Sequence, residues 1–273
     1  MTNLELQKIA VEVRKGIVTG VHAAKSGHPG GSLSAADIFT YLYFAEMNID
    51  TQDPKKSDRD RFVLSKGHVA PGLYSTLAQR GFFSTDELNG LRHLGAMLQG
   101  HPDMNKVPGI DMSSGSLGNG ISCAVGMAMS AKVHHQDYMT YVMLGDGECQ
   151  EGIVWEAAMA ANHHALKNLV AIVDCNGVQI NGFTQDIMKT EPLADKWKAF
   201  GWRVVECDGH DMADILRALH TAKTMRWPTV ILMRTVKGRG VSFMEDDCKW
   251  HGSAPSDEEM VQAIAEIKEG GIL

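Results

Sequence analysis

From residue 117 onward the sequence alternates short, almost continuous apolar runs with longer segments of helical periodicity. Strands buried on both faces of a sheet have such runs, whereas strands with one wet face alternate apolar and polar residues. Parallel strands that are joined by crossover helices produce this order along a chain. We therefore expect an α/β fold, a parallel β-sheet with helices on both faces. The predicted strands are residues 138–144, 168–174, 202–206 and 228–236, and the predicted helices are residues 117–133, 153–166, 192–200 and 212–224.

The N-terminal part of the chain contains similar but less regular signals. Ser34 and Asp37 have the spacing of a capping box, which predicts that a helix begins at this point. Because no repeat and no long linker interrupts the chain, we expect residues 1–273 to form a single domain. Outside the regular part, helices are predicted at residues 4–24, 35–47, 71–81 and 257–268, with a short strand within 58–68.

Composition excludes several classes of function. The net charge of −7 lacks the basic footprint of a nucleic-acid-binding protein, so no nucleic-acid partner is expected. No apolar run approaches the roughly 18 residues of a membrane span, and no membrane association is expected. Residues 1–16 lack the apolar core of a signal peptide, and the five cysteines include no CxxC pair. These features predict a cytoplasmic protein with free thiols.

The stretch "GDGECQEG", residues 145–152, places acidic groups directly after a predicted buried strand, where desolvation is costly without a positive partner. Asn176 follows the next strand, 30 positions after Asp146, and parallel neighbours would bring the two residues together. A carboxylate, an amide oxygen and a loop carbonyl suit Mg²⁺ or Ca²⁺ with a phosphate as a further ligand. Gly145 and Gly147 would let the backbone approach that phosphate. The alternative for an isolated GDG is a simple strand-to-helix turn.

A series of stretches resembles the motifs of the transketolase family, in the family's order and from about residue 5 to about residue 256. The resemblance is to the N-terminal half, the diphosphate-binding (PP-type) domain of the thiamine diphosphate-binding fold, as found in split two-subunit transketolases. The matching stretches are "SGHPGG", "LSKGHVAPGLYS", "GHPD", "SGSLGNGISCAVGMAMS", "GDGECQEGIVWEA", "VDCNGVQING" and "TVKGRGVSFMEDDCKWHG".

The resemblance implies a binding site for thiamine diphosphate and Mg²⁺, with Ca²⁺ or Mn²⁺ as substitutes. The metal ligands would be Asp146, Asn176 and the main-chain carbonyl of Val178. Ser116 stands where many members of the family have proline, which affects the expected shape of that loop. The implied cofactor-binding residues are His68, Gly115, Ser116, Leu117, Asp146, Gly147, Glu148, Asn176, Val178, Ile180, Lys237 and His251.

The resemblance also implies catalytic roles for His28, His68, His101, His251 and Glu151. Neutral imidazole near pH 7 accepts or donates protons and binds sugar hydroxyls, which suits ketol transfer. Glu151 resembles an interface glutamate that communicates with the partner's catalytic carboxylate. By contrast, the paired histidines at 134–135 and 163–164 match nothing in the family and are expected to be solvated.

The implied reaction is transfer of a two-carbon ketol unit from a ketose phosphate to an aldose phosphate, as in the pentose phosphate pathway of carbohydrate metabolism. The family's aminopyrimidine-binding glutamate and phosphate-binding arginines belong to a C-terminal half. We therefore expect this chain to be nearly inactive alone and to join a C-terminal transketolase subunit in an α₂β₂ heterotetramer. The alternatives are part of an enzyme like 1-deoxy-D-xylulose-5-phosphate synthase, or a non-catalytic scaffold subunit that binds thiamine diphosphate.

Overall fold

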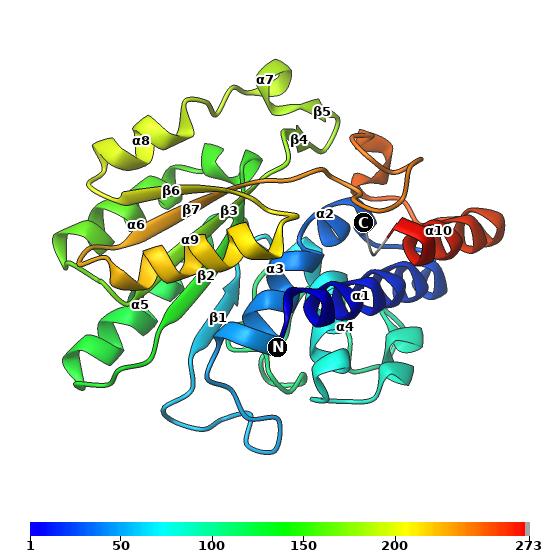
Figure 1. The fold of residues 1–273 in the computed structure, drawn as a ribbon, viewed down its shortest axis with the longest axis horizontal. Coiled ribbons are helices and arrows are strands. Elements are labelled where there is room, and N and C mark those ends of the chain that lie inside the picture. Colours follow the sequence, from blue (N-terminus) through cyan, green and yellow to red (C-terminus); the bar gives the residue numbers. More distant parts are fainter. Residues whose placement is uncertain (271–273) are drawn as a thin grey trace.

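A parallel five-stranded sheet forms the centre of the molecule, in the strand order β1-β2-β3-β7-β6 (Figure 1). The coordinates are a computed structural model that describes residues 1–270, with side chains as far as Ile267. Every pair of neighbouring strands is parallel, so the predicted α/β fold is confirmed. The strands are β1 (Arg61–Leu64), β2 (Thr140–Gly145), β3 (Leu169–Cys175), β6 (Arg203–Asp208) and β7 (Thr229–Arg234).

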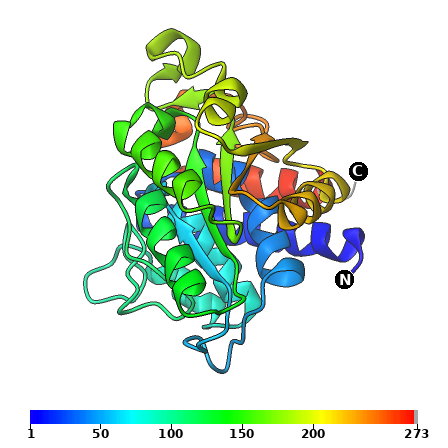
Figure 2. The same ribbon diagram turned by 90° about the vertical axis from the view of Figure 1, so that its left-hand side faces the viewer.

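Helices cover both faces of this sheet because successive strand residues point to opposite sides. In β2, Tyr141 and Met143 join one apolar core cluster, whereas Val142 and Leu144 join another. Figure 1 shows α9 crossing one face while α5 and α6 lie against the other, and Figure 2 shows α5 and α6 stacked side by side. The covering helices are α3 (Ala36–Tyr41), α5 (Asn119–Val133), α6 (Gly152–His163), α8 (Leu193–Ala199) and α9 (Met212–Thr224).

The N-terminal helices pack at one end of the sheet, where the first helix lies against the last one. A third core cluster, which includes Val13, Ile17 and Trp250, joins α1 to α10 and to the segment before it (Figure 1). The elements of this part are α1 (Asn3–Ala24), α2 (Pro29–Ser34), the π-helix η1 (Leu42–Glu46), the 3₁₀ turn η2 (Gly67–Val69), α4 (Ala70–Arg80), the 3₁₀ helix η3 (Thr85–Gly90), the 3₁₀ turn η5 (Cys248–His251) and α10 (Asp257–Gly270).

A small hairpin follows β3 and projects beyond the sheet, as both views show (Figures 1 and 2). Its two strands are antiparallel, with Val178 opposite Phe183. The hairpin arises where the apolar strand pattern ends in the glycine-containing stretch "CNGVQING", and Gly177 adopts a left-handed φ of +73°. Its elements are β4 (Val178–Gln179), β5 (Gly182–Phe183) and α7 (Thr184–Ile187), and the 3₁₀ turn η4 (Gly147–Gln150) lies between β2 and α6.

The predicted capping box at Ser34 and Asp37 is wrong. Ser34 is the last residue of α2, and its hydroxyl donates to the Gly31 carbonyl and to Asp174. The backbone continues from α2 through Ala35 into α3 in right-handed helical conformation, so it leaves no free helix start for a cap. Asp37 instead accepts hydrogen bonds from a buried Arg14, a stronger interaction than a surface cap.

The structure bears on three further expectations from the sequence. No helix within residues 1–270 combines the length and apolarity needed to cross a membrane. All five cysteines are free thiols, and three of them lie in the core. The histidines at 134–135 and 163–164 are exposed, as predicted.

The Arg14–Asp37 pair predicts how stability depends on pH. Burial raises the pKa of Asp37, but the Arg14 charge and the hydrogen bonds from His210 and Arg14 outweigh burial and lower this pKa from 3.8 to about 2. A carboxyl whose pKa is lower in the folded state than in the unfolded state stabilises the fold at pH values above its unfolded-state pKa. This stabilisation is lost as the pH falls through the folded-state pKa. We expect Asp37→Asn to reduce the free energy of unfolding by about 3 kcal/mol at neutral pH, because Arg14 keeps a buried charge without a partner.

The difference in the free energy of unfolding between Asp37→Asn and the unmodified chain should shrink by about 2 kcal/mol as the pH falls from about 5 towards 2. Urea unfolding over this pH range, as far as the native state persists, measures it. Asp195→Asn is the control, because Asp195 lies exposed in a surface pair with Lys198. A stability difference between Asp37→Asn and the unmodified chain that did not change with pH would contradict the prediction.

Candidate active site

A pocket of about 340 Å³ opens at the carboxyl ends of the strands, where ligands bind in open parallel sheets. β1, β2, β3 and β7 each contribute residues from the loop that follows them. The volume lies within the range of small-molecule and cofactor sites. The pocket is lined by His28, Gly31, Lys66, His68, His101, Gly115, Leu117, Gly145, Asp146, Gly147, Glu148, Gln150, Glu151, Asn176, Val178, Gln179, Ile180, Lys237 and His251.

The three predicted metal ligands lie together in this pocket. β2 and β3 are paired in register, with Gly145 opposite Asp174, so the residues that follow them are neighbours. Oδ2 of Asp146 accepts a hydrogen bond of 2.7 Å from the Gly177 amide, which ties the two loops together. Asn176 and Val178 line the same cavity, and the Val178 carbonyl accepts a hydrogen bond from Lys237. The arrangement provides a carboxylate, an amide and a carbonyl oxygen, a hard donor set.

The charges around this donor set fit both a cation and an anion. Burial and the neighbouring Asp174 raise the pKa of Asp146 to about 6, so ionised Asp146 would be stabilised by a bound cation. Lys237 is 2% exposed, and burial together with the charge of Lys66 lowers its pKa to about 8. Within the described part of the chain Lys237 has no carboxylate partner; its Nζ contacts the Val178 carbonyl and His251 Nδ1, each at 3.1 Å. A divalent ion with a diphosphate would satisfy both groups.

Three of the predicted histidines form a compact group. The ring centroids of His28, His68 and His251 lie 5.1 to 5.3 Å from one another. Burial, and then nearby cations including Lys237, lower the pKa to about 4 for His28 and to about 3 for His251. Burial and the Lys66 charge also lower the pKa of His68 well below its usual value. These imidazoles are therefore neutral near pH 7 and can donate or accept hydrogen bonds.

His28 carries a further sign of a ligand site. Its Nδ1 is buried and has no hydrogen-bond partner within the described residues, and the same is true of Ser114 Oγ in the adjacent loop. Buried polar atoms are almost always paired, so orphaned atoms beside a cavity indicate groups that bind a ligand or water.

The fourth histidine, His101, lines the same pocket. Its ring lies against Gly115, where an added Cβ would be 3.2 Å from the ring. The His101 carbonyl accepts a hydrogen bond of 2.9 Å from the buried Tyr74, which fixes the loop that carries the ring. Burial and then Arg92 lower the pKa of His101 as well.

The other predicted residues divide into four groups. Gly115, Leu117 and Gly147 line the wall, whereas Ile180 and Glu151 lie exposed at the rim. Ser116 is exposed and lies outside the pocket lining. Glu148 is buried, and its carboxylate accepts hydrogen bonds from Ser65 and from the amides of Gly118 and Gly145, so it bridges the loops around the site.

Sequence reasoning missed the buried network behind the predicted metal ligands. Asp174 is fully buried at the end of β3 and accepts hydrogen bonds from Lys66 at 2.5 Å, from Ser34 at 2.6 Å and from Thr235. It also accepts one of 2.9 Å from the Asn176 side-chain amide, and Asn176 Oδ1 in turn accepts a hydrogen bond of 3.0 Å from the Val178 backbone amide. The sequence does contain a signal for Asp174. This aspartate ends the apolar run "NLVAIVD", much as Asp146 follows the apolar run "YMTYVML".

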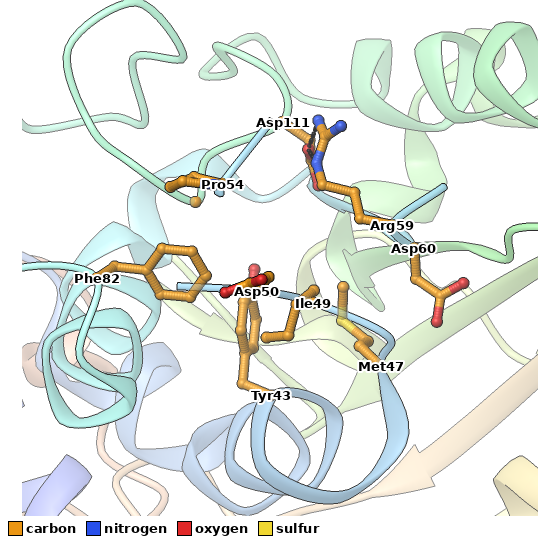
Figure 3. Close-up of a pocket in the computed structure, with 10 residues that line it drawn as sticks. Tyr43, Met47, Ile49, Asp50, Pro54, Arg59, Asp60, Phe82 and Asp111 are labelled. Atoms are coloured by element: carbon orange, nitrogen blue, oxygen red, sulfur yellow. Dashed lines mark hydrogen bonds and ion pairs between the residues drawn. The ribbon is translucent and has the colours of Figure 1, made fainter. Parts of the chain in front are cut away.

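A second cavity lies away from these residues and is too small for a ligand. Figure 3 shows its lining, in which the side chains of Tyr43, Met47 and Ile49 face a loop that carries Arg59. Its volume is about 10 Å³, about the space of one water molecule. Arg59 pairs with the buried Asp111 at this point and closes the loop against the core.

The sequence profile described as "Transketolase, thiamine diphosphate binding domain" matches residues 6–268. This chain belongs to the transketolase family. An apulose-4-phosphate transketolase subunit of Phocaeicola vulgatus is 46% identical over 97% of this chain and 94% of its own length. The 6-deoxy-6-sulfo-D-fructose transketolase subunit SqwG of a Clostridium species is 44% identical and covers 98% of both chains.

Among solved structures, transketolase from Campylobacter jejuni superposes with a TM-score of 0.93 and is 32% identical. The match covers 98% of this chain but only 43% of that transketolase, so the present chain spans less than half of the solved enzyme. The predicted family and fold are thus confirmed. The pocket described above lies in a transketolase thiamine diphosphate-binding domain.

The Lys66–Asp174 pair of this domain generates a prediction about stability. We expect Lys66→Met to lower the free energy of unfolding by about 3 kcal/mol, because Asp174 then keeps a buried charge without its cation. Adding Asp174→Asn to this variant should restore part of the lost free energy of unfolding, because asparagine removes the buried negative charge and has nearly the same shape as aspartate. Urea unfolding at neutral pH compares the two variants. A double variant no more stable than Lys66→Met alone would contradict the prediction.

Proposed function

We propose that this chain is the diphosphate-binding subunit of a two-subunit transketolase that acts in the cytoplasm. It would transfer a two-carbon ketol unit from a ketose phosphate to an aldose phosphate, with thiamine diphosphate and Mg²⁺ as cofactors. Residues 1–273 would form one domain, and a C-terminal subunit would complete the site in an α₂β₂ assembly. The relatives above are named as transketolase subunits over nearly their whole length, which supports a divided enzyme.

The observation that carries the proposal is one pocket that combines a hard oxygen set with a buried lysine and neutral histidines. Asp146, Asn176 and the Val178 carbonyl would hold Mg²⁺ between the two strand ends. Lys237 would contact the diphosphate, and Gly147 would let it approach the backbone. When bound, thiamine diphosphate supplies the carbon nucleophile that adds to a ketose carbonyl.

The histidines of this chain would handle the sugar. A C–C bond breaks in ketol transfer as a hydroxyl loses its proton, and a neutral imidazole accepts that proton. His28 and His101 both line the cavity and come from separate loops, so they can bind different hydroxyls of one sugar. His68 and His251 lie next to Lys66 and Lys237, and these charges favour their neutral form. Four neutral histidines have no use in a scaffold subunit, so we favour a catalytic subunit.

The rim of the pocket fits a partner subunit. Ile180, Phe183, Ile187 and Met188 form an apolar patch on the projecting hairpin and α7, and between 47% and 62% of each residue is exposed. This patch is continuous with the pocket, because Ile180 belongs to both. Gln150 donates to the Met188 carbonyl at 2.7 Å and links the patch to the loop that contains Asp146. A partner that covered the patch would also close the pocket, with the exposed Glu151 at its edge.

Binding of the cofactors tests the metal site. In the complex with the C-terminal subunit, calorimetric titration with thiamine diphosphate at saturating Mg²⁺ should give a clear binding isotherm. We expect Asp146→Asn to weaken this binding by at least about 100-fold, since changes even to residues behind a metal ligand cost 10- to 100-fold. Asp53→Asn, an exposed carboxylate far from the pocket, should leave the affinity unchanged. Absence of binding heat for the unmodified complex would refute the proposed function.

Turnover tests the catalytic role and the need for a partner. The chain alone should show almost no ketol transfer, and the complex should act on a ketose phosphate but not on pyruvate. We expect His101→Ala to lower kcat of the complex by about 100-fold, the lower end of general acid–base effects. Robust turnover by the chain alone would refute the divided site. Unchanged turnover by His101→Ala would favour a scaffold subunit.

A further inference from the structure

Lys237 is buried in the pocket but stands on a loop that begins directly after β7. The two glycines that follow it, Gly238 and Gly240, have left-handed φ angles of +84° and +92°. At Gly238 an added Cβ would lie 2.2 Å from the Met244 carbonyl, so the chain turns too tightly there for any side chain. Such a loop has many accessible conformations when it is not held, because glycine restricts the backbone least. The position of the Lys237 ammonium group therefore depends on contacts made by its neighbours.

The backbone of Gly30 and of Asp246 holds the loop at Gly238 and at Lys237. Side-chain contacts to Val236 and Arg239 come from three residues outside the active-site pocket, of which two are buried and the third is 11% exposed. His210, in the turn between β6 and α9, accepts a hydrogen bond of 2.9 Å from the Val236 amide at its Nε2. Its Nδ1 lies 2.8 Å from Asp37 on α3. Arg14 on α1 makes two hydrogen bonds to Asp37 and a third, of 3.2 Å, from its Nε to the Arg239 carbonyl. We call Arg14, Asp37 and His210 the clasp.

The clasp holds the loop on both sides of Lys237. Val236 lies one residue before the lysine and Arg239 two residues after it. Because the Val236 amide donates to Nε2, this nitrogen carries no proton, so Nδ1 carries it and donates to Asp37. The carboxylate thereby fixes both the orientation and the tautomer of the ring. The clasp side chains are between 7% and 11% exposed, so water competes little with these bonds.

We propose that His210 is a positioning residue for diphosphate binding: through the Val236 amide it holds Lys237 in the place where the diphosphate is bound. Asp37 and Arg14 serve this role by orienting the ring and by holding Arg239. The inference rests on the proposed function, since it assigns a diphosphate to Lys237. It adds residues from α1, α3 and the β6–α9 turn, none of which touches the ligand pocket.

Two substitutions of His210 separate its two contacts. Asn places an amide near the former Nδ1, so His210→Asn keeps the donor to Asp37 and loses the acceptor for Val236. Gln reaches the former Nε2, so His210→Gln keeps an acceptor for Val236 and loses the donor to Asp37. Neither variant can carry an imidazolium charge. If His210 acts through the loop, His210→Asn should weaken diphosphate binding and His210→Gln should largely preserve it.

The experiment measures the dissociation constant of thiamine diphosphate by calorimetry, at saturating Mg²⁺ and in the complex with the C-terminal subunit. We expect about a tenfold increase for His210→Asn, comparable to the loss of a residue behind a metal ligand, and about a twofold change at most for His210→Gln. Each variant is also made with Lys237→Met, which keeps the aliphatic stem and removes the ammonium group. In that background His210→Asn should have almost no further effect, since the group that it positions is absent.

The outcomes are distinct. A tenfold loss with His210→Asn that disappears in the Lys237→Met background supports the inference. An unchanged affinity, or a loss that persists in full without the ammonium group, overturns it and assigns the clasp a structural role only. If His210→Asn does not fold, Arg14→Lys takes its place under the same criteria, because lysine keeps a charge beside Asp37 and cannot also hold the Arg239 carbonyl. Failure of the unmodified complex to bind thiamine diphosphate would count against the proposed function instead.

Discussion

The structure depends on the compensation of buried charge at the carboxyl ends of the central strands. Asp146 follows β2 and Asp174 is the penultimate residue of β3, and both are almost completely removed from water. Two carboxylates this close cannot both remain ionised in a medium of low polarity without cations nearby. Lys66 neutralises Asp174 directly, at 2.5 Å. Asp146 has no such partner within the described residues, and its raised pKa records this imbalance. This unbalanced charge supports the proposal that a metal ion binds at this edge of the sheet.

The parallel sheet is the reason why these charges meet at all. In a parallel sheet all the strands end at the same edge, so loops distant in sequence face one another there. Lys66, Asp146 and Asp174 come from three successive strands of the sheet, and Thr235 comes from the strand on the far side of β3. The helices that cover both faces keep water away from the strand ends, which strengthens each interaction. The same burial keeps the active-site histidines neutral, so the electrostatics of the pocket follow from the architecture.

The sequence predicted the sheet and its helices well because buried strands have a strong and simple signal. The apolar runs that end just before Asp146 and Asn176 were enough to predict that these residues face one pocket, and both line it, with the Gly177 amide donating to Asp146. Contacts that depend on packing between distant elements had no such signal. Ser34 was interpreted as a local cap, whereas tertiary structure joins it to Asp174, 140 residues away in the sequence. Local propensity was overridden because a buried carboxylate gains more from a donor than a helix end gains from a cap.

The division between rigid and exposed parts bears on how a divided enzyme would work. The wall of the pocket is built from groups whose hydrogen bonds are internal: Glu148 joins three loops, and the clasp secures the loop of Lys237. The rim, in contrast, exposes the apolar hairpin and Glu151. A site that must bind a doubly charged ion and a diphosphate benefits from a wall that is already in place, because no binding energy is then used to order it. An exposed apolar rim remains available for burial by another chain. Diphosphate binding and association with the partner would therefore favour each other, because the partner closes the pocket over the same charges that the wall holds.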